Sequence, residues 1–176
     1  FLKDALKINP SFDFALTNLG AVLNELAKFD EGEQCLRKAL SINSSSPMAL
    51  NNLGNILSNK KKNMEAELCY RKAIEIKSDF SLAYSNLGSL LSKQGNLVEA
   101  EKYTEKAINY NPKFELAYVN LGSIKIDLDK LSEAEDLFLS AIEINKNYNY
   151  AYRNLFRLYE KTNKLSKLKN KIESLK

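Results

Sequence analysis

Histidine is absent from the 176-residue sequence, and cysteine, proline and glycine are scarce, with 2, 3 and 6 residues. Without histidine or a thiol pair at metal-ligand spacing, the side chains that usually build zinc and related sites are missing. The sequence also lacks a glycine-rich phosphate loop and a serine nucleophile motif. We therefore expect no catalytic residues, no metal, no cofactor and no small-molecule substrate, and predict that the chain is not an enzyme.

The two cysteines, Cys35 and Cys69, lie 34 residues apart. A disulfide needs Cα atoms less than about 7 Å apart, and equivalent positions of successive repeats would hold them farther apart than that. We interpret both as small buried hydrophobic residues. They do not indicate a redox compartment.

Long apolar runs are also missing. No segment approaches the roughly 20 apolar residues that span a bilayer, and no signal-peptide pattern is visible. With 44% hydrophobic and 27% charged residues, the composition favours helix throughout. We expect a soluble, all-helical, cytoplasmic protein without a membrane span, and a piece of a longer chain, because Phe1 opens inside a helical pattern.

One asparagine recurs every 34 residues, which defines a repeat array. If this asparagine is numbered position 6, residues 1–12 are the tail of a preceding unit and 1–176 is one array. The complete units are 13–46, 47–80, 81–114 and 115–148, followed by a degenerate unit, 149–176. The five asparagines are Asn18, Asn52, Asn86, Asn120 and Asn154.

Apolar residues within each unit follow helical rather than strand periodicity. Positions 3, 4, 7 and 11 line one face of a first helix, and positions 20, 23, 27 and 30 line a second. Turn residues such as Gly95 separate the two, and apparent capping boxes at Asp30–Glu33 and Ser132–Glu135 mark second-helix starts. Each unit is therefore predicted to be a helical hairpin. Hairpins of this size must stack to bury their apolar faces.

Glycine occupies position 8 in the four complete units, at residues 20, 54, 88 and 122. A residue without Cβ lets two helix axes approach closely. We expect this glycine to face the alanine at position 20 or 27.

Residues 81–114 carry Tyr84, Leu87, Gly88, Ala100, Ala107 and Pro112 at positions 4, 7, 8, 20, 27 and 32. In this pattern the sequence resembles the tetratricopeptide repeat. The resemblance implies an all-α fold, a right-handed α-solenoid of stacked antiparallel helix pairs, with first helices lining a concave groove. Lys125 departs from the pattern at position 11, so either Ile124 and Ile126 take over its packing or its ammonium reaches solvent.

The two ends of the array carry separate expectations. Residues 165–175 are predicted to form a polar capping helix, and residues 1–9 form half a hairpin whose uncapped edge offers a site for self-association. Residues 149–176 hold eight basic and two acidic side chains. We favour a solvated cap over nucleic-acid binding for this charge.

In the family's geometry the five asparagines form an asparagine ladder along the groove. Each amide offers a donor and an acceptor, which matches any peptide backbone. The ladder, with SDFSLAYSNLG from Ser78, resembles the repeats of O-linked N-acetylglucosamine transferases. We predict a protein–protein interaction module that binds extended peptide segments through the ladder. Residues beside the ladder would tune preference, namely Asn55, Ser89, Ser123 and Arg157 at position 9 and Arg153 at position 5.

The ladder could also arise without a ligand. The chain holds 20 asparagines, duplicated units inherit residues together, and an inter-helix hydrogen bond would offset the roughly 0.5 kcal/mol that asparagine costs in a helix. Position 2 is always apolar and could form ligand pockets, although we favour packing there. The lysine of a carboxylate clamp is missing from position 5. The functional alternatives are the substrate-recruiting part of a larger transferase, in particular a glycosyltransferase, and a structural or self-association module.

Overall fold

The computed structural model describes residues 12–163, and every regular element among them is an α-helix. First helices begin at position 1 of each unit and second helices at position 17, so the 34-residue period of the sequence is also the period of the fold. The helices are α2 (Asp13–Glu25), α3 (Phe29–Ile42), α4 (Pro47–Asn59), α5 (Asn63–Ile76), α6 (Ser81–Lys93), α7 (Leu97–Tyr110), α8 (Glu115–Asp127), α9 (Leu131–Ile144) and α10 (Asn149–Lys161). The predicted capping helix at 165–175 and the uncapped edge at 1–9 lie outside the described residues.

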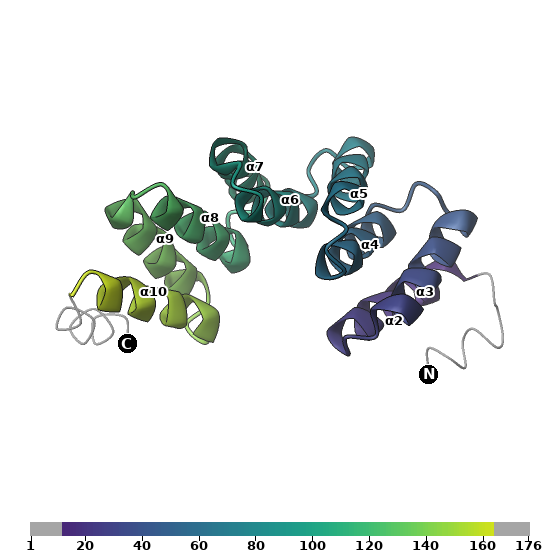
Figure 1. The fold of residues 1–176 in the computed structure, drawn as a ribbon, viewed down its shortest axis with the longest axis horizontal. Helices are drawn as coiled ribbons and strands as arrows, with labels where there is room; N and C mark the ends of the chain where they lie inside the picture. The colour runs from purple at the N-terminus through teal and green to yellow at the C-terminus, as the bar shows by residue number, and fades with distance from the viewer. Residues whose placement is uncertain (1–11, 164–176) are drawn as a thin grey trace. The chain divides into compact units, whose positions relative to one another are not determined.

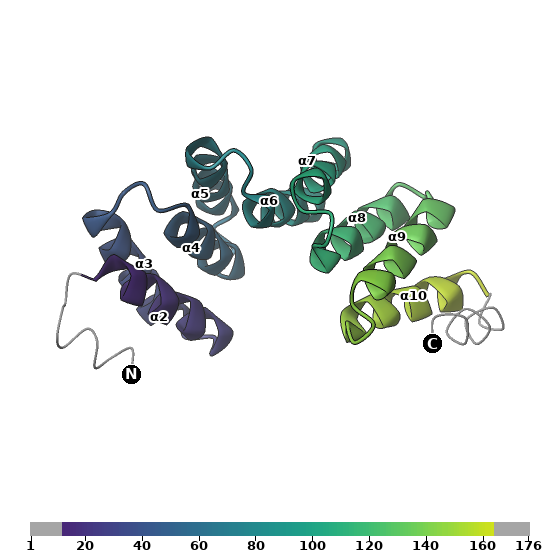
Figure 2. The ribbon, with the colours of Figure 1, turned by 180° about the vertical axis from the view of Figure 1, so that it is seen from behind.

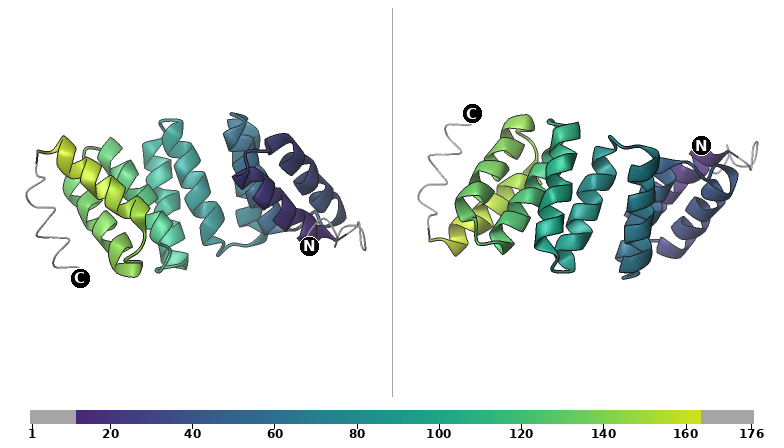
Figure 3. Two further views of the ribbon diagram at one scale, coloured as in Figure 1. Left: turned by 90° about the horizontal axis from the view of Figure 1, so that it is seen from below. Right: turned by 90° about the horizontal axis from the view of Figure 1, so that it is seen from above.

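Helices pack as antiparallel pairs, which confirms the predicted helical hairpins and the all-α solenoid. Figures 1 and 2 show α2 beside α3, α4 beside α5, and α8 beside α9. The chain forms two compact units, residues 1–90 and 91–176, which divide within α6. Within each unit consecutive hairpins stack, as the two views of Figure 3 make clear.

The core is made of side chains that the 3.6-residue periodicity directs inward. In residues 91–176 the described core includes Phe138, Leu155 and Tyr159, all fully buried, between α8, α9 and α10. In residues 1–90, Leu50 of α4, Ala73 of α5 and Phe80 gather with Ala83 of α6. Each apolar cluster joins neighbouring hairpins, so no hairpin has a complete core alone.

The glycine at position 8 has a different neighbour from the one we expected. A Cβ added at Gly20, Gly54 or Gly122 would lie 2.5 Å from Leu36, Tyr70 or Phe138 respectively, and each of those residues is at position 24. The nearest neighbour of the glycine in these three units is therefore a large residue at position 24. Position 20 also lies close to it in the first unit, where a Cβ added at Gly32 would be 3.2 Å from Gly20 O. The absent side chain makes room for a large residue of the second helix, and this brings the two helices of a hairpin together.

The predicted capping boxes are also wrong. The helices α3 and α9 begin at Phe29 and Leu131, one residue before Asp30 and Ser132, and neither has a side-chain cap. Asp30 and Ser132 therefore lie inside the first turn, where the acidic Asp30 of α3 and Glu133 of α9 interact favourably with the helix dipole.

Each hairpin turn instead uses a left-handed residue at position 15. Its φ is +56° at Ala27, +63° at Lys61, +83° at Gly95, +60° at Asp129 and +57° at Asn163. At Ala27 the turn is closed by Ala27 N–H to Asn24 O (3.0 Å) and Lys28 N–H to Leu23 O (2.8 Å), the Schellman pattern. The backbone hydrogen bonds end the first helix without help from the side chain at position 15.

Candidate functional site

All five residues of the asparagine ladder lie at the same place on a first helix, and all are part-buried. Asn18, Asn52 and Asn86 belong to α2, α4 and α6 of residues 1–90, while Asn120 and Asn154 belong to α8 and α10 of residues 91–176. Each of these side chains is therefore partly open to solvent.

A buried neighbour links two members of the ladder in residues 1–90. Asn51, at position 5 of α4, is fully buried. Its Nδ2 donates to Asn52 Oδ1 at 3.4 Å, and its Oδ1 accepts from Asn86 Nδ2 of the next hairpin at 2.9 Å. The inter-helix hydrogen bond that the sequence left open as an explanation is thus present at Asn86.

A second asparagine pair joins α4 to the preceding first helix, α2, near the C-terminal ends of both helices. Asn59 Nδ2 of α4 donates to Asn24 Oδ1 of α2 at 2.9 Å. Sequence reasoning missed Asn24, Asn51 and Asn59 as structural residues. The available signal was their place at positions 12, 5 and 13, next to the ladder on the helix surface.

The ladder residues still have unused amide groups in the described part of the chain. No hydrogen bond to the side chain of Asn18 is present there. Asn52 uses only its oxygen, Asn86 only its nitrogen, and Asn154 only its nitrogen, which donates to Tyr150 O of the same helix at 2.7 Å. Because no buried side-chain N or O atom is unsatisfied among the described residues, these free groups are ones that water or a ligand can reach.

The candidate residues beside the ladder differ in their exposure and in the hydrogen bonds that they already make within the chain. Asn55 is part-buried and its Oδ1 accepts from the Tyr70 hydroxyl at 2.8 Å, while Ser123 Oγ donates to Val119 O of its own helix at 3.0 Å. Ser89 is part-buried, whereas Arg153 and Arg157 are exposed. The other position 5 residues, Thr17, Asn51, Ser85 and Val119, are buried.

Apolar residues at position 2 are more open than expected. We predicted packing there, and Leu82 does pack against the cluster around Phe80. Phe14, Met48 and Tyr150, however, are 62%, 44% and 43% exposed. Phe14 and Tyr150 touch only their position 34 neighbours among the described aromatic rings, with centroid separations of 6.0 Å to Phe12 and 6.2 Å to Tyr148. Apolar surface therefore borders the ladder.

Position 21 is glutamate in every complete unit, at residues 33, 67, 101 and 135, a recurrence that sequence reasoning also missed. Three of these carboxylates bind the next hairpin, at its first helix or at the residue that ends that helix. Glu33 accepts from Lys60 at 2.7 Å and Glu135 from the Tyr159 hydroxyl at 2.6 Å. The hydrogen bond from Lys60 lowers the pKa of Glu33 and outweighs burial, which acts to raise it.

Glu101 makes the third contact, with Lys125. The sequence offered replacement packing or exposure for this lysine, but it is only 7% exposed and its ammonium binds Glu101 at 2.5 Å and also Glu133. Burial disfavours the charge, yet the two carboxylates hold the pKa of Lys125 above its ordinary value. The Lys125 hydrogen bond in turn lowers the pKa of Glu101.

Two further findings concern the kinds of site the described residues can form. No cluster of three or more cysteine, aspartate and glutamate side chains there is arranged to hold a metal ion. Among the same residues, no helix has the length and apolar character needed to cross a membrane.

Family models of the tetratricopeptide repeat match residues 47–80 and 81–114, and residues 15–46 and 116–148. No curated protein sequence matches the chain. Among solved structures, PilF of Pseudomonas aeruginosa is 22% identical with a TM-score of 0.80, covering 93% of this chain and 76% of its own. A tetratricopeptide repeat protein of Thermus thermophilus is 18% identical, with a TM-score of 0.80 over 93% and 89%. YrrB, described as a TPR protein with an unusual peptide-binding site, is 20% identical, with a TM-score of 0.65 over 99% and 92%. The TM-scores show a shared fold, and at identities this low the likeness shows the fold alone.

Proposed function

The chain belongs to the tetratricopeptide repeat family, whose members generally act as protein–protein interaction modules, and from this premise we propose that it binds extended peptide segments of a partner protein through the asparagine ladder. The observation that carries the proposal is the set of unused, solvent-reachable amide groups on Asn18, Asn52, Asn86 and Asn154. An asparagine amide can donate to a peptide carbonyl and accept from a peptide N–H. Recognition of this kind depends little on the ligand's side chains.

The surroundings of the ladder support a peptide ligand. The half-exposed Phe14, Met48 and Tyr150 offer apolar surface beside the amides, and extended ligands use alternate side chains to fill such surface. Arg153 and Arg157 add positive charge at α10, so we expect acidic residues to be preferred by the part of a ligand that reaches them. The fold shared with YrrB, a TPR protein with a peptide-binding site, is compatible with this use.

A peptide-array screen followed by calorimetry tests the proposal. The Asn18→Ala/Asn52→Ala double variant removes ladder amides without removing the Asn86–Asn51 bond. Each lost hydrogen bond is worth roughly 0.5–1.5 kcal/mol, so affinity should fall about tenfold. Asn63→Ala/Asn109→Ala is the matched control, because it removes two asparagines of α5 and α7 and should bind like the wild type.

Circular dichroism must first show that both double variants keep the wild-type helix content. Equal binding by the folded ladder variant and the wild type would refute the proposal. In that case the ladder serves only the packing of first helices, as the Asn51–Asn86 bond already does.

A further inference from the structure

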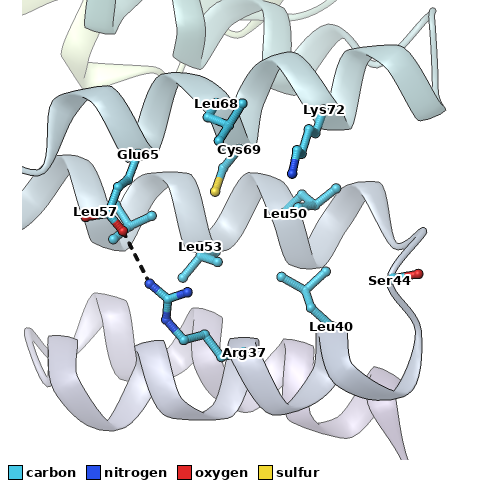
Figure 4. A pocket seen from close by; sticks show the side chains of 10 residues that line it. All are labelled: Arg37, Leu40, Ser44, Leu50, Leu53, Leu57, Glu65, Leu68, Cys69 and Lys72. Carbon is cyan, nitrogen blue, oxygen red and sulfur yellow. Dashed lines mark hydrogen bonds and ion pairs between the residues drawn. The ribbon is translucent and has the colours of Figure 1, made fainter.

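A pocket of about 330 Å³ lies away from the asparagine ladder, between α3, α4 and α5 of residues 1–90. Leu50, Leu53 and Leu57 of α4 form its floor, and these are positions 4, 7 and 11, on a different face of α4 from Asn52. Figure 4 shows α3 contributing Arg37 and Leu40 to one wall and α5 contributing Cys69 and Lys72 to the other. The pocket is therefore an apolar hollow between two consecutive second helices.

The sequence explains why there is room here. Position 4 is Leu50 in this unit but tyrosine at residues 84, 118 and 152. Position 23 is Cys69, whereas the next two units have Tyr103 and Leu137. Two smaller side chains thus meet in the hairpin of α4 and α5, and a close-packed interior would otherwise fill such a space.

Charge is distributed unevenly around the mouth of the pocket. Arg37 is neutralised, since its guanidinium binds Glu33 at 2.8 Å and Glu65 at 3.4 Å across one end. Lys72, at the other end, is exposed and forms no ion pair with any described carboxylate, and its ammonium points to the pocket side of α5 in Figure 4. Among Arg37, Glu65 and Lys72 one positive charge is left without a partner.

We propose that this pocket is a second peptide-binding site, which takes an aliphatic side chain of a partner while a carboxylate next to that side chain pairs with Lys72. Ligand pockets usually enclose about 300–1,000 Å³, and this one is at the small end, which suits one or two side chains. Leucines supply the apolar contact, and the free ammonium selects an acidic neighbour. The site is independent of the ladder, because no ladder residue lines it.

The burial of Cys69 agrees with this use. Its thiol points toward α4 in Figure 4, and burial raises its pKa, so the group stays a neutral thiol and part of the apolar lining. Leu68, by contrast, lies at the rim of the pocket and is 54% exposed. An incoming aliphatic side chain would cover both.

The test uses the full chain and a blocked ten-residue peptide with a central leucine between two aspartates. Titration followed by amide and leucine-methyl NMR should give saturable shifts at Leu50, Leu53 and Cys69, and a dissociation constant below about 1 mM. Peptides with serine for the leucine, or asparagine for both aspartates, should bind at least five times more weakly.

Variants that fill the pocket or remove the charge at its mouth make the test specific. Cys69→Leu, which copies Leu137 of a later unit, should weaken binding tenfold or more. Lys72→Gln should abolish the preference for aspartate over asparagine. Leu68→Ser changes an exposed rim residue and should weaken binding about threefold even if Cys69→Leu disturbs the fold. The Asn18→Ala/Asn52→Ala variant should show the same saturable shifts at Leu50, Leu53 and Cys69 as the wild type. Because the ladder can also bind an extended peptide, these pocket resonances separate failure of this site from failure of the ladder.

Three results would overturn the proposal. One is the absence of saturable shifts up to about 1 mM peptide. Another is unchanged affinity in both Cys69→Leu and Leu68→Ser. The third is tighter binding of free hexanoate than of the peptide, which would make the pocket a site for small aliphatic carboxylates instead.

Discussion

Glycine introduced at position 15 of the hairpin turns should stabilise the fold. Ala27 and Lys61 have φ values of +56° and +63° and are exposed, so no packing contact depends on their side chains. A left-handed conformation costs a residue with a Cβ roughly 1–2 kcal/mol. Glycine avoids this cost but loses about 0.4–1 kcal/mol more chain entropy on folding. The expected net gain is about 0.5–1 kcal/mol for each turn.

The assay is urea unfolding of the Ala27→Gly/Lys61→Gly variant, followed by circular dichroism. Its midpoint should rise, and its thermal midpoint should increase by about 2–4 °C per kcal/mol gained, as is usual for a chain of this length. Gly95→Ala is the matched reverse substitution, because Gly95 has φ +83° and an added Cβ would contact nothing within 4 Å. It should lose about 1 kcal/mol from backbone strain alone.

A lower midpoint for the double glycine variant would refute this reasoning. So would a Gly95→Ala variant as stable as the wild type. Either result would mean that the side chain at position 15, and not the backbone conformation, determines the stability of these turns.

Two further predictions concern polar contacts between hairpins. The Lys125 hydrogen bond lowers the pKa of Glu101, so the stabilisation from this ion pair is complete above the ordinary carboxyl range and is lost as pH falls through the lowered pKa. Glu101→Gln should therefore cost about 1–2 kcal/mol at pH 7 and make stability depend less on pH when urea titrations at neutral and acidic pH are compared. An unchanged pH dependence would contradict this. Asn51→Ala removes the hydrogen bonds of this buried amide to both Asn52 and Asn86 and should cost about 1–3 kcal/mol. Asn52→Ala removes only the first of these bonds and should cost less in the same urea assay, and equal losses would contradict this reasoning.

Periodicity was enough to predict the helices, since each first helix begins at position 1 and each hairpin pairs as the apolar pattern requires. Side-chain partners between hairpins were harder to predict. The residue nearest the position 8 glycine is at position 24, because of how each helix is rotated about its own axis. A pattern of apolar residues shows which face of a helix is buried, but it does not show which single residue of the partner helix lies opposite. Lys125 was unexpected for a related reason, since its burial depends on Glu101, which is 24 residues away in the sequence and adjacent only once hairpins stack. The five asparagines lie on first helices, as the periodicity predicts, whereas the role of Asn51 depended on a contact 35 residues away in the sequence.

The glutamates at position 21 give the contacts between hairpins different sensitivities to salt. Glu33 and Glu101 bind ammonium groups, and such attractions weaken as dissolved ions screen them. Glu135 instead accepts from the neutral Tyr159 hydroxyl, and burial raises the pKa of that phenol, so this contact involves only one charge. We therefore expect rising ionic strength to weaken the α3–α4 and α7–α8 contacts more than the α9–α10 contact, although burial of Lys125 and Glu33 limits the screening. One glutamate position thus makes neighbouring segments of the same array respond differently to their ionic surroundings.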